Sequence, residues 1–203
     1  MVNFDLKSGY HHIDIYHEHT EFLSFSWDFE GRTRFFSFQV LPFGLSTAPY
    51  IFTKCLRPLV KHWRNKGIYI VVYLDDGWVR SSSFQECMVV SDIVKSDLLA
   101  AGLVPNKDKS FWIPTQRIDW LGITWDGVYG YIMVVKRRVL DILASIDKVL
   151  EALPYVTARM LAAVAGKIIS LKIVVGPIAQ LMSRFLYYEV INREQYHWDR
   201  AFK

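Results

Sequence analysis

The chain of 203 residues is 52% apolar and 15% aromatic, which is enough to bury a core as one domain or as one domain with a small appendage. Its two cysteines, Cys55 and Cys87, fall inside helical patterns, and we interpret them as buried, reduced thiols of an intracellular protein. The first residues lack the zones of a signal peptide, and Lys167 and Lys172 interrupt the apolar stretch 160–182. We therefore expect no membrane partner and a location in the cytoplasm or nucleus.

The net charge of +4 is unevenly distributed along the chain. Residues 1–131 carry 13 Lys and Arg against 14 Asp and Glu, a net charge of −1, whereas residues 132–203 carry 11 against 6, a net charge of +5. A basic surplus of this kind is typical of a part that holds a phosphate backbone. An ordinary solvated helix face explains the same surplus, so both interpretations stay open.

The first third of the chain predicts a short apolar strand that ends at Asp5, followed by a strand pair. Residues 22–27 and 34–40 have strand character, with Phe and Ser alternating at 35–38, and the turn between them is predicted at 28–31.

A helix then begins near residues 46–49, where Ser, Thr and Pro form a strong start signal, and ends before Gly67. Pro58 should kink this helix. Its apolar stripe consists of Ile51, Phe52, Cys55, Leu59 and Trp63.

Two adjacent carboxylates, Asp75 and Asp76, follow the apolar run 67–72, which is short, β-branched and aromatic and so predicts a buried strand. Asp-Gly is a strong hairpin signal, so we predict a turn over 75–77 that leads into a second strand at 78–80. A plain turn explains these residues, and so does a divalent metal site at the tip of a sheet, because carboxylate oxygens suit magnesium.

The rest of the chain predicts one more hairpin and four more helices. Residues 83–86 form a capping box that opens a helix to about Ala101. A hairpin follows, with strands at 117–125 and 131–135. The last three helices are predicted at 136–152, at 157–172 and at 177–192.

The order of these motifs resembles the palm of reverse transcriptases. Asp5 precedes an aromatic residue by five positions, Leu41-Pro42-Phe43-Gly44 opens a helix, and Tyr73-Leu74-Asp75-Asp76 ends a strand. Residues 102–110 resemble the fourth motif of that family, and 120–122 its primer-gripping hairpin.

Within the family, the segments 5–13, 72–76 and 157–187 resemble the DIRS-like retroelements, which integrate with a tyrosine recombinase. The gypsy-like retrotransposons, which share the Phe-Gly-Leu loop, are the next most similar group.

The resemblance implies an α+β fold, in which a polymerase palm with an antiparallel sheet and two packed helices precedes a helical thumb. Residues 1–125 would form the palm with a remnant of the fingers at about 20–40. Residues 126–203 would form the end of the primer-grip hairpin and the thumb or connection helices. Because only four residues precede Asp5, most of the fingers would be missing.

The resemblance also assigns the metal ligands. Asp5, Asp75 and Asp76 would bind two Mg²⁺ ions, with Mn²⁺ as an alternative, for nucleotidyl transfer from a dNTP to the primer 3′-hydroxyl. Lys109 would help the pyrophosphate to leave, with Lys107 as the second candidate.

Substrate contacts follow from the same resemblance. Tyr10 would lie beneath the sugar and exclude ribonucleotides, although a core tyrosine is the alternative. Phe43, Gly44 and Leu6 would contact the nucleotide. The primer grip would consist of Trp120, Leu121 and Gly122.

The implied function is that of an RNA-directed DNA polymerase domain of a retrotransposon. Its partners would be an RNA or DNA template with primer and a dNTP, with a ribonuclease H domain adjacent in the full polyprotein. Two alternatives remain open, namely a decayed or domesticated copy that binds nucleic acid without polymerising, and an RNA-dependent RNA polymerase. If most of the fingers are missing, the chain should bind primer-template but extend it poorly.

Overall fold

The computed structural model describes residues 1–194 and 197–201. The chain forms two compact units, Met1–Ile118 and Asp119–Lys203. Among the helices of the described residues, none combines the length and the apolar character that crossing a bilayer requires.

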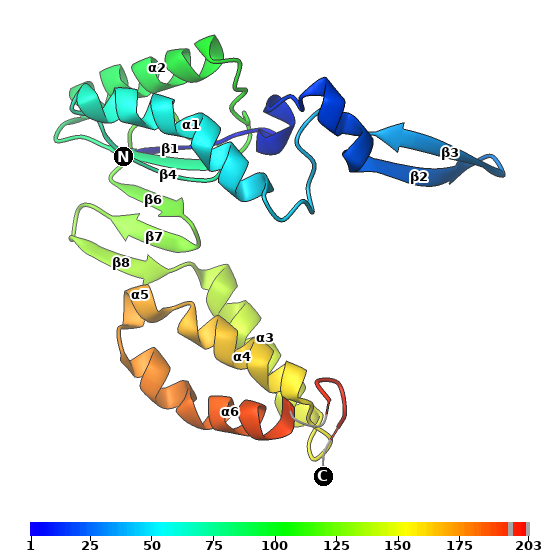
Figure 1. Ribbon diagram of the computed structural model, residues 1–203. Helices are drawn as coiled ribbons and strands as arrows, with labels where there is room; N and C mark the ends of the chain where they lie inside the picture. The colour runs from blue at the N-terminus through cyan, green and yellow to red at the C-terminus, as the bar shows by residue number, and fades with distance from the viewer. Residues whose placement is uncertain (195–196, 202–203) are drawn as a thin grey trace. The chain divides into compact units, whose positions relative to one another are not determined.

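The first unit is built on a three-stranded sheet with the order β1-β5-β4. β1 (Val2–Asp5) and β4 (Tyr69–Tyr73) both pair antiparallel with the central strand β5 (Asp76–Arg80). The helices α1 (Ala48–Asn65) and α2 (Phe84–Ala100) cover one face of this sheet (Figure 1). The predicted antiparallel sheet with two packed helices is therefore confirmed.

Side chains along each strand point alternately to the two faces of the sheet, and the apolar ones define the face that the helices cover. Phe4, Ile70 and Val79 point into the core and are 2%, 4% and 0% exposed. They pack with apolar side chains of α1, among them Phe52 and Trp63, in one continuous core. Burial of this apolar surface is the main stabilising contribution to the unit.

The turn between β4 and β5 is displaced from its predicted position. Tyr73 pairs with Asp76, so the turn consists of Leu74 and Asp75 rather than of residues 75–77. Leu74 has the left-handed φ of 54° that such a two-residue turn requires. Gly77 instead lies inside β5, where an added Cβ would stand 2.1 Å from the ring of Phe4. Glycine at position 77 is therefore explained by close packing against Phe4, and the Asp76-Gly77 pair does not form the turn.

The two helices agree with their predicted ranges, and α1 continues through Pro58. The prediction that both cysteines are buried is wrong for Cys55, which is exposed on α1, whereas Cys87 is 1% exposed. At the start of α2, the Glu86 backbone N–H donates to Ser83 Oγ at 3.2 Å, which confirms the capping residue.

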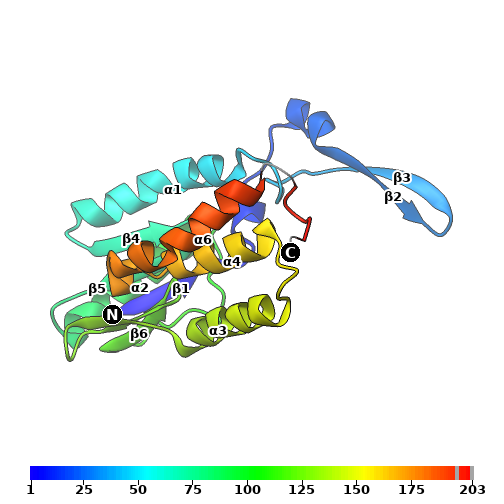
Figure 2. The ribbon, with the colours of Figure 1, turned by 90° about the horizontal axis from the view of Figure 1, so that it is seen from below.

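A long hairpin occupies the segment between β1 and α1. Two short 3-10 helices, Gly9–His12 and His17–Leu23, lead into β2 (Ser24–Phe29) and β3 (Arg32–Ser37). The turn lies at 30–31, so the predicted turn at 28–31 was too long and the strands extend further toward the tip. Figures 1 and 2 both show this hairpin extending beyond the rest of the first unit.

The boundary between the units falls within β6 (Arg117–Trp120), which forms a three-stranded sheet in the order β6-β7-β8 with β7 (Ile123–Asp126) and β8 (Tyr131–Val134). The single strand predicted at 117–125 is wrong. Leu121 and Gly122 adopt positive φ values of 50° and 74° and divide it into two strands.

Four helices complete the second unit: α3 (Lys136–Glu151), α4 (Ala158–Ile169), α5 (Lys172–Val175) and α6 (Ile178–Glu194). The helix predicted at 157–172 therefore ends earlier, and a separate short helix follows it. Val156, Leu161 and Val190 form the small core between these elements.

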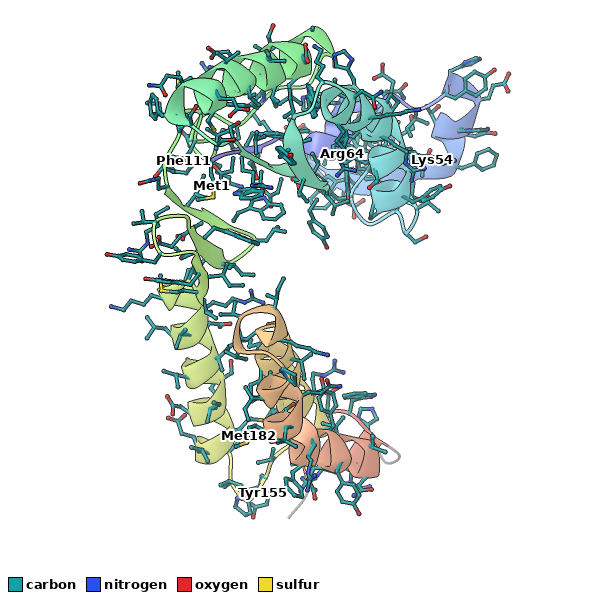
Figure 3. The ribbon with its side chains drawn as sticks, turned by 90° about the vertical axis from the view of Figure 1, so that its left-hand side faces the viewer. Met1, Lys54, Arg64, Phe111, Tyr155 and Met182 are labelled. Carbon is teal, nitrogen blue, oxygen red and sulfur yellow. The ribbon has the colours of Figure 1, made fainter. Side chains whose placement is uncertain are left out.

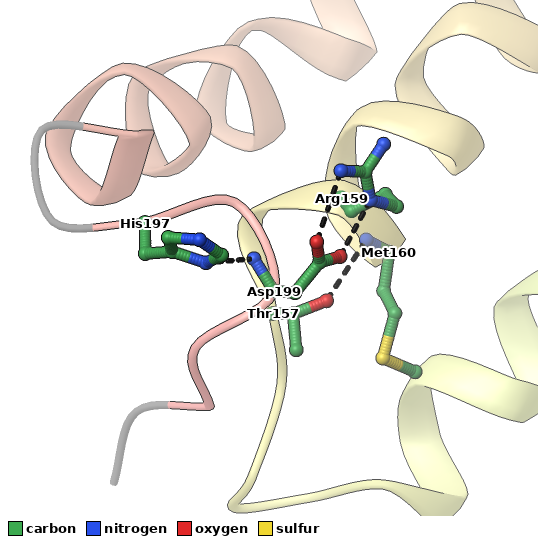
Figure 4. A network of polar contacts seen from close by, with 5 residues as sticks. All are labelled: Thr157, Arg159, Met160, His197 and Asp199. Atoms are coloured by element: carbon green, nitrogen blue, oxygen red, sulfur yellow. Dashed lines mark hydrogen bonds and ion pairs between the residues drawn. The ribbon is translucent and has the colours of Figure 1, made fainter.

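A polar network closes the start of α4, as Figure 4 shows. Thr157 Oγ1 accepts a hydrogen bond from the Met160 backbone N–H at 3.2 Å, which is the N-cap contact. The Arg159 guanidinium makes two hydrogen bonds to the Asp199 carboxylate, at 2.5 and 3.0 Å. This pairing lowers the pKa of Asp199 and joins the last described residues of the chain to α4.

Candidate active site

Three predicted carboxylates meet at one edge of the first sheet. Asp5 ends β1 and lies directly opposite Asp76, the first residue of β5. Asp75 occupies the preceding turn, and its carbonyl oxygen accepts a hydrogen bond from the Leu6 backbone N–H at 2.8 Å. The strand register and this hydrogen bond together fix the three backbone positions.

The electrostatics of Asp76 reflect this crowding. Burial raises its pKa from 3.8 to about 6, and the negative charges of Asp75 and Asp5 contribute to the same rise. Among residues 1–194 and 197–201, no three His, Cys, Asp or Glu side chains stand in the arrangement of a complete metal-binding group. The mutual repulsion of these carboxylates nevertheless fits a divalent cation, because a cation would neutralise the charge that now raises the pKa.

One ammonium group already contributes positive charge at this edge. Lys109 Nζ lies 3.7 Å from Asp5 Oδ2, with the lysine side chain 68% exposed and that of Asp5 16% exposed. Lys109 also lowers the pKa of Asp76, in opposition to the effects of burial and the acids. The structure therefore brings the predicted lysine to the predicted aspartates.

The loop that carries Lys109 is bound to the backbone of β1. The Asn106 backbone N–H donates to the carbonyl oxygen of Asp5 at 2.7 Å, and the Asp5 backbone N–H donates to Ser110 Oγ at 3.1 Å. Sequence reasoning missed Ser110, since a serine next to a basic loop carries no signal that it will bind a strand about 100 residues earlier.

The predicted substrate residues form an aromatic group beside the acids. The ring of Tyr10 lies 5.0 Å from that of Phe43 and 5.3 Å from that of Phe52, measured between centroids. Phe43 is 64% exposed, and Gly44 has the left-handed φ of 90°. Leu6, in contrast, is 1% exposed, so its side chain belongs to the core and is not available to a ligand in this conformation.

Two further residues near the acids were not singled out from the sequence. An added Cβ at Gly9 would stand 3.1 Å from the Cβ of Asp75 and 3.0 Å from the ring of Phe52. The absence of a side chain at Gly9 therefore makes room for the β4–β5 turn that contains Asp75. His12 joins the same segment to the loop after α2, because its Nε2 accepts from the Val104 backbone N–H at 3.2 Å.

The predicted primer-grip residues lie in the second unit. Trp120 ends β6, and Leu121 with Gly122 forms the turn into β7. This turn borders a cavity of about 570 Å³, which Arg137 and Arg138 also line. The primer-binding role of the turn stays a prediction.

A family model described as reverse transcriptase (RNA-dependent DNA polymerase) matches residues 1–125. This match spans more than half of the chain, and the chain therefore belongs to the reverse transcriptase family. The matched region contains all the acids of the sheet edge, Lys109 and the aromatic group.

Three polyproteins are similar to the chain in sequence. It is 29% identical over 154 residues to the retrovirus-related Pol polyprotein from transposon 297 of Drosophila melanogaster, and the match covers 75% of this chain. It is 32% identical over 130 residues, or 63% of the chain, to that from transposon opus of the same species. The putative enzymatic polyprotein of Cassava vein mosaic virus is 29% identical over 59% of the chain.

The chain spans 14%, 12% and 17% of the lengths of these three relatives and so matches only one part of each of them. The family match thus identifies a reverse transcriptase domain, and the three relatives that it resembles are polyproteins.

Two solved structures share the fold. The foamy viral protease-reverse transcriptase dRH in complex with ds DNA aligns over 99% of this chain and 32% of its own, with a TM-score of 0.71 and 20% identity. The foamy viral protease-reverse transcriptase in complex with an RNA/DNA hybrid aligns over 84% of this chain and 21% of its own, with a TM-score of 0.66 and 22% identity. The predicted α+β polymerase fold is confirmed at this level.

Proposed function

We propose that this chain is the catalytic palm and thumb of an RNA-directed DNA polymerase encoded by a retrotransposon. The observation that carries the proposal is the cluster of Asp5, Asp75 and Asp76 at one sheet edge, with the Lys109 ammonium 3.7 Å from Asp5. The family match supports the activity, and the two foamy viral structures, which hold nucleic acid, support primer-template as the partner.

Asp5 and Asp75 would hold two magnesium ions, with Asp76 adding negative charge and fixing geometry. Bound magnesium would lower the pKa of the primer hydroxyl and neutralise the triphosphate of the dNTP. Lys109 lies on a loop beside Asp5, so its ammonium group can neutralise or protonate the departing pyrophosphate. Bound cations would also relieve the repulsion that raises the pKa of Asp76.

Deoxynucleotide selection would depend on Tyr10. Its ring is packed between Phe43 and Phe52, so it cannot move aside without breaking two aromatic contacts. A ring held in this way excludes a 2′-hydroxyl by contact, which favours a DNA polymerase over an RNA polymerase. The DIRS-like subgroup and an adjacent ribonuclease H domain are the finer parts of the proposal and depend on the sequence resemblance.

The metal site is testable without turnover. Mn²⁺ binding to the chain can be measured by electron paramagnetic resonance. Asp75→Asn should lower the Mn²⁺ affinity about tenfold or more. Asp92→Asn, at an exposed position on α2, is the matched control and should bind Mn²⁺ like the wild type. Addition of a dNTP should tighten Mn²⁺ binding in the wild type. Equal Mn²⁺ affinity in all three proteins would contradict the proposed function.

A further inference from the structure

One face of α1 carries a stripe of positive charge that the carboxylate cluster does not use. The stripe consists of Lys54, Arg57, Lys61 and Arg64, all exposed. Their spacing of three, four and three residues places them within an arc of about 80° and along a rise of about 15 Å. Figure 3 labels the first and last of them on this helix. We refer to these four residues as the basic stripe.

The surroundings of the basic stripe leave its positive charge without a neutralising carboxylate. The sequence from Ala48 to Lys66 contains no Asp or Glu. The nearby Asp97 of α2 pairs with His62 at 3.7 Å and with Lys66 at 3.9 Å, which belong to another side of the helix. Within the described residues 1–194 and 197–201, no ion pair joins a cation of the stripe to a carboxylate.

An exposed aromatic side chain and a cavity extend the basic stripe. Tyr50, one turn before Lys54, is 61% exposed, and the Lys54 ammonium lies 5.2 Å from its ring centroid. Between α1 and β4, a cavity of about 190 Å³ is lined by Arg57 and Arg64 and reaches Leu74, the turn residue next to Asp75. The stripe is therefore continuous with the edge of the sheet that carries the acids.

We propose that the basic stripe binds the phosphate backbone of a single-stranded nucleic acid along the outside of α1. Four like charges on one helix face repel each other, whereas a row of phosphates neutralises them with release of counterions. An exposed tyrosine at one end adds a stacking surface for an unpaired base. This surface lies outside the carboxylate cluster and goes beyond the proposed polymerase activity.

The test measures binding of a fluorescein-labelled single-stranded RNA of about 20 nucleotides by fluorescence anisotropy, without primer, dNTP or divalent metal. The stripe variant combines Lys54→Gln, Arg57→Gln and Lys61→Gln. Arg64 is kept because its guanidinium also donates to the Ile70 carbonyl oxygen at 3.2 Å. The control variant removes the same charge from three exposed positions of the first unit outside the basic stripe, Lys66→Gln, Arg80→Gln and Lys95→Gln.

For three lost phosphate contacts, the slope of log K against log salt should become shallower by about 2 in the stripe variant. The control variant should keep a slope close to that of the wild type. A 4-thiouridine RNA should also crosslink to peptides from residues 48–65 in the wild type. Equal slopes in the two variants, or crosslinks that avoid α1, would overturn the proposal.

Poly-glutamate serves as a competitor of a different chemical class. If the stripe variant loses poly-glutamate binding as strongly as it loses RNA binding, the basic stripe is a general site for acidic chains, and the nucleic-acid assignment is overturned. The RNA assay contains no divalent metal, primer or dNTP, and the Mn²⁺ assay contains no RNA, so each assay reports on one site alone. Failure of the basic stripe and failure of the proposed activity are therefore distinguishable.

Discussion

Removing the charge of Asp76 should stabilise the metal-free protein. The pKa of this carboxyl is raised from 3.8 to about 6 in the folded chain by burial and then by the charges of Asp75 and Asp5. Between these two values the folded state binds more protons than the unfolded state, so stability decreases as the pH rises through this window and stays lower above about 6. Asp76→Asn removes the charge with almost no change of shape.

The magnitude follows from the same values. A rise from 3.8 to about 6 corresponds to roughly 3 kcal/mol without screening. Because the carboxyl is partly exposed, solvent reduces this value, and we expect Asp76→Asn to stabilise the first unit by about 1–2 kcal/mol near pH 8. Near pH 4.5, where the folded carboxyl is largely protonated but the unfolded one is not, the difference should fall to about a third of this value.

Urea unfolding in EDTA, followed by hydrogen–deuterium exchange of peptides from the first unit, measures this difference at both pH values. Asp92→Asn is the control and should change little at either pH. Adding Mg²⁺ should stabilise the wild type more than Asp76→Asn. The electrostatic interpretation of the acid cluster is incorrect if Asp76→Asn is no more stable than the wild type near pH 8. It is also incorrect if the difference in stability between the two proteins is independent of pH.

Three other predictions concern side chains around the cluster. Gly77→Ala places a Cβ 2.1 Å from the buried ring of Phe4 and should destabilise the chain by about 3 kcal/mol in urea unfolding, whereas a neutral result would remove the packing argument. In the absence of nucleotide, Lys109→Gln should tighten Mn²⁺ binding, because an ammonium group no longer competes with the metal for Asp5. An unchanged Mn²⁺ affinity in electron paramagnetic resonance titrations would contradict this prediction. Tyr10→Ala should increase ribonucleotide use relative to deoxynucleotide use in incorporation assays, and an unchanged ratio would leave this ring a core residue only.

Most helices were predicted from the sequence because the residues that start a helix and form its apolar face lie within a few positions of each other. Ser83 and Glu86 are three residues apart and form the cap that their spacing predicts. The buried face of α1 likewise follows from its apolar periodicity, with Phe52 and Trp63 fully enclosed. Cys55 shows the limit of this reasoning, since a small side chain at the margin of an apolar stripe can face solvent.

Turns were predicted less well because their register depends on distant residues. The β4–β5 turn lies at Leu74 and Asp75 because Gly77 must pass the ring of Phe4, which belongs to a strand at the start of the chain. For the same reason the sequence could not reveal that Ser110 binds Asp5. The acids were identified through their family resemblance, whereas the pairing of Asp5 with Asp76 across β1 and β5 became apparent from the strand register.

Incorporation of a single nucleotide tests the central claim most directly. A DNA primer annealed to an RNA template is incubated with the chain, Mg²⁺ and millimolar dNTP, for long enough to detect slow addition. We predict addition of the complementary dNTP by the wild type and by Asp92→Asn, dependence on Mg²⁺, and no addition by Asp75→Asn. Addition that continues in Asp75→Asn, or that proceeds equally in EDTA, would contradict the assignment of this chain as a metal-dependent RNA-directed DNA polymerase.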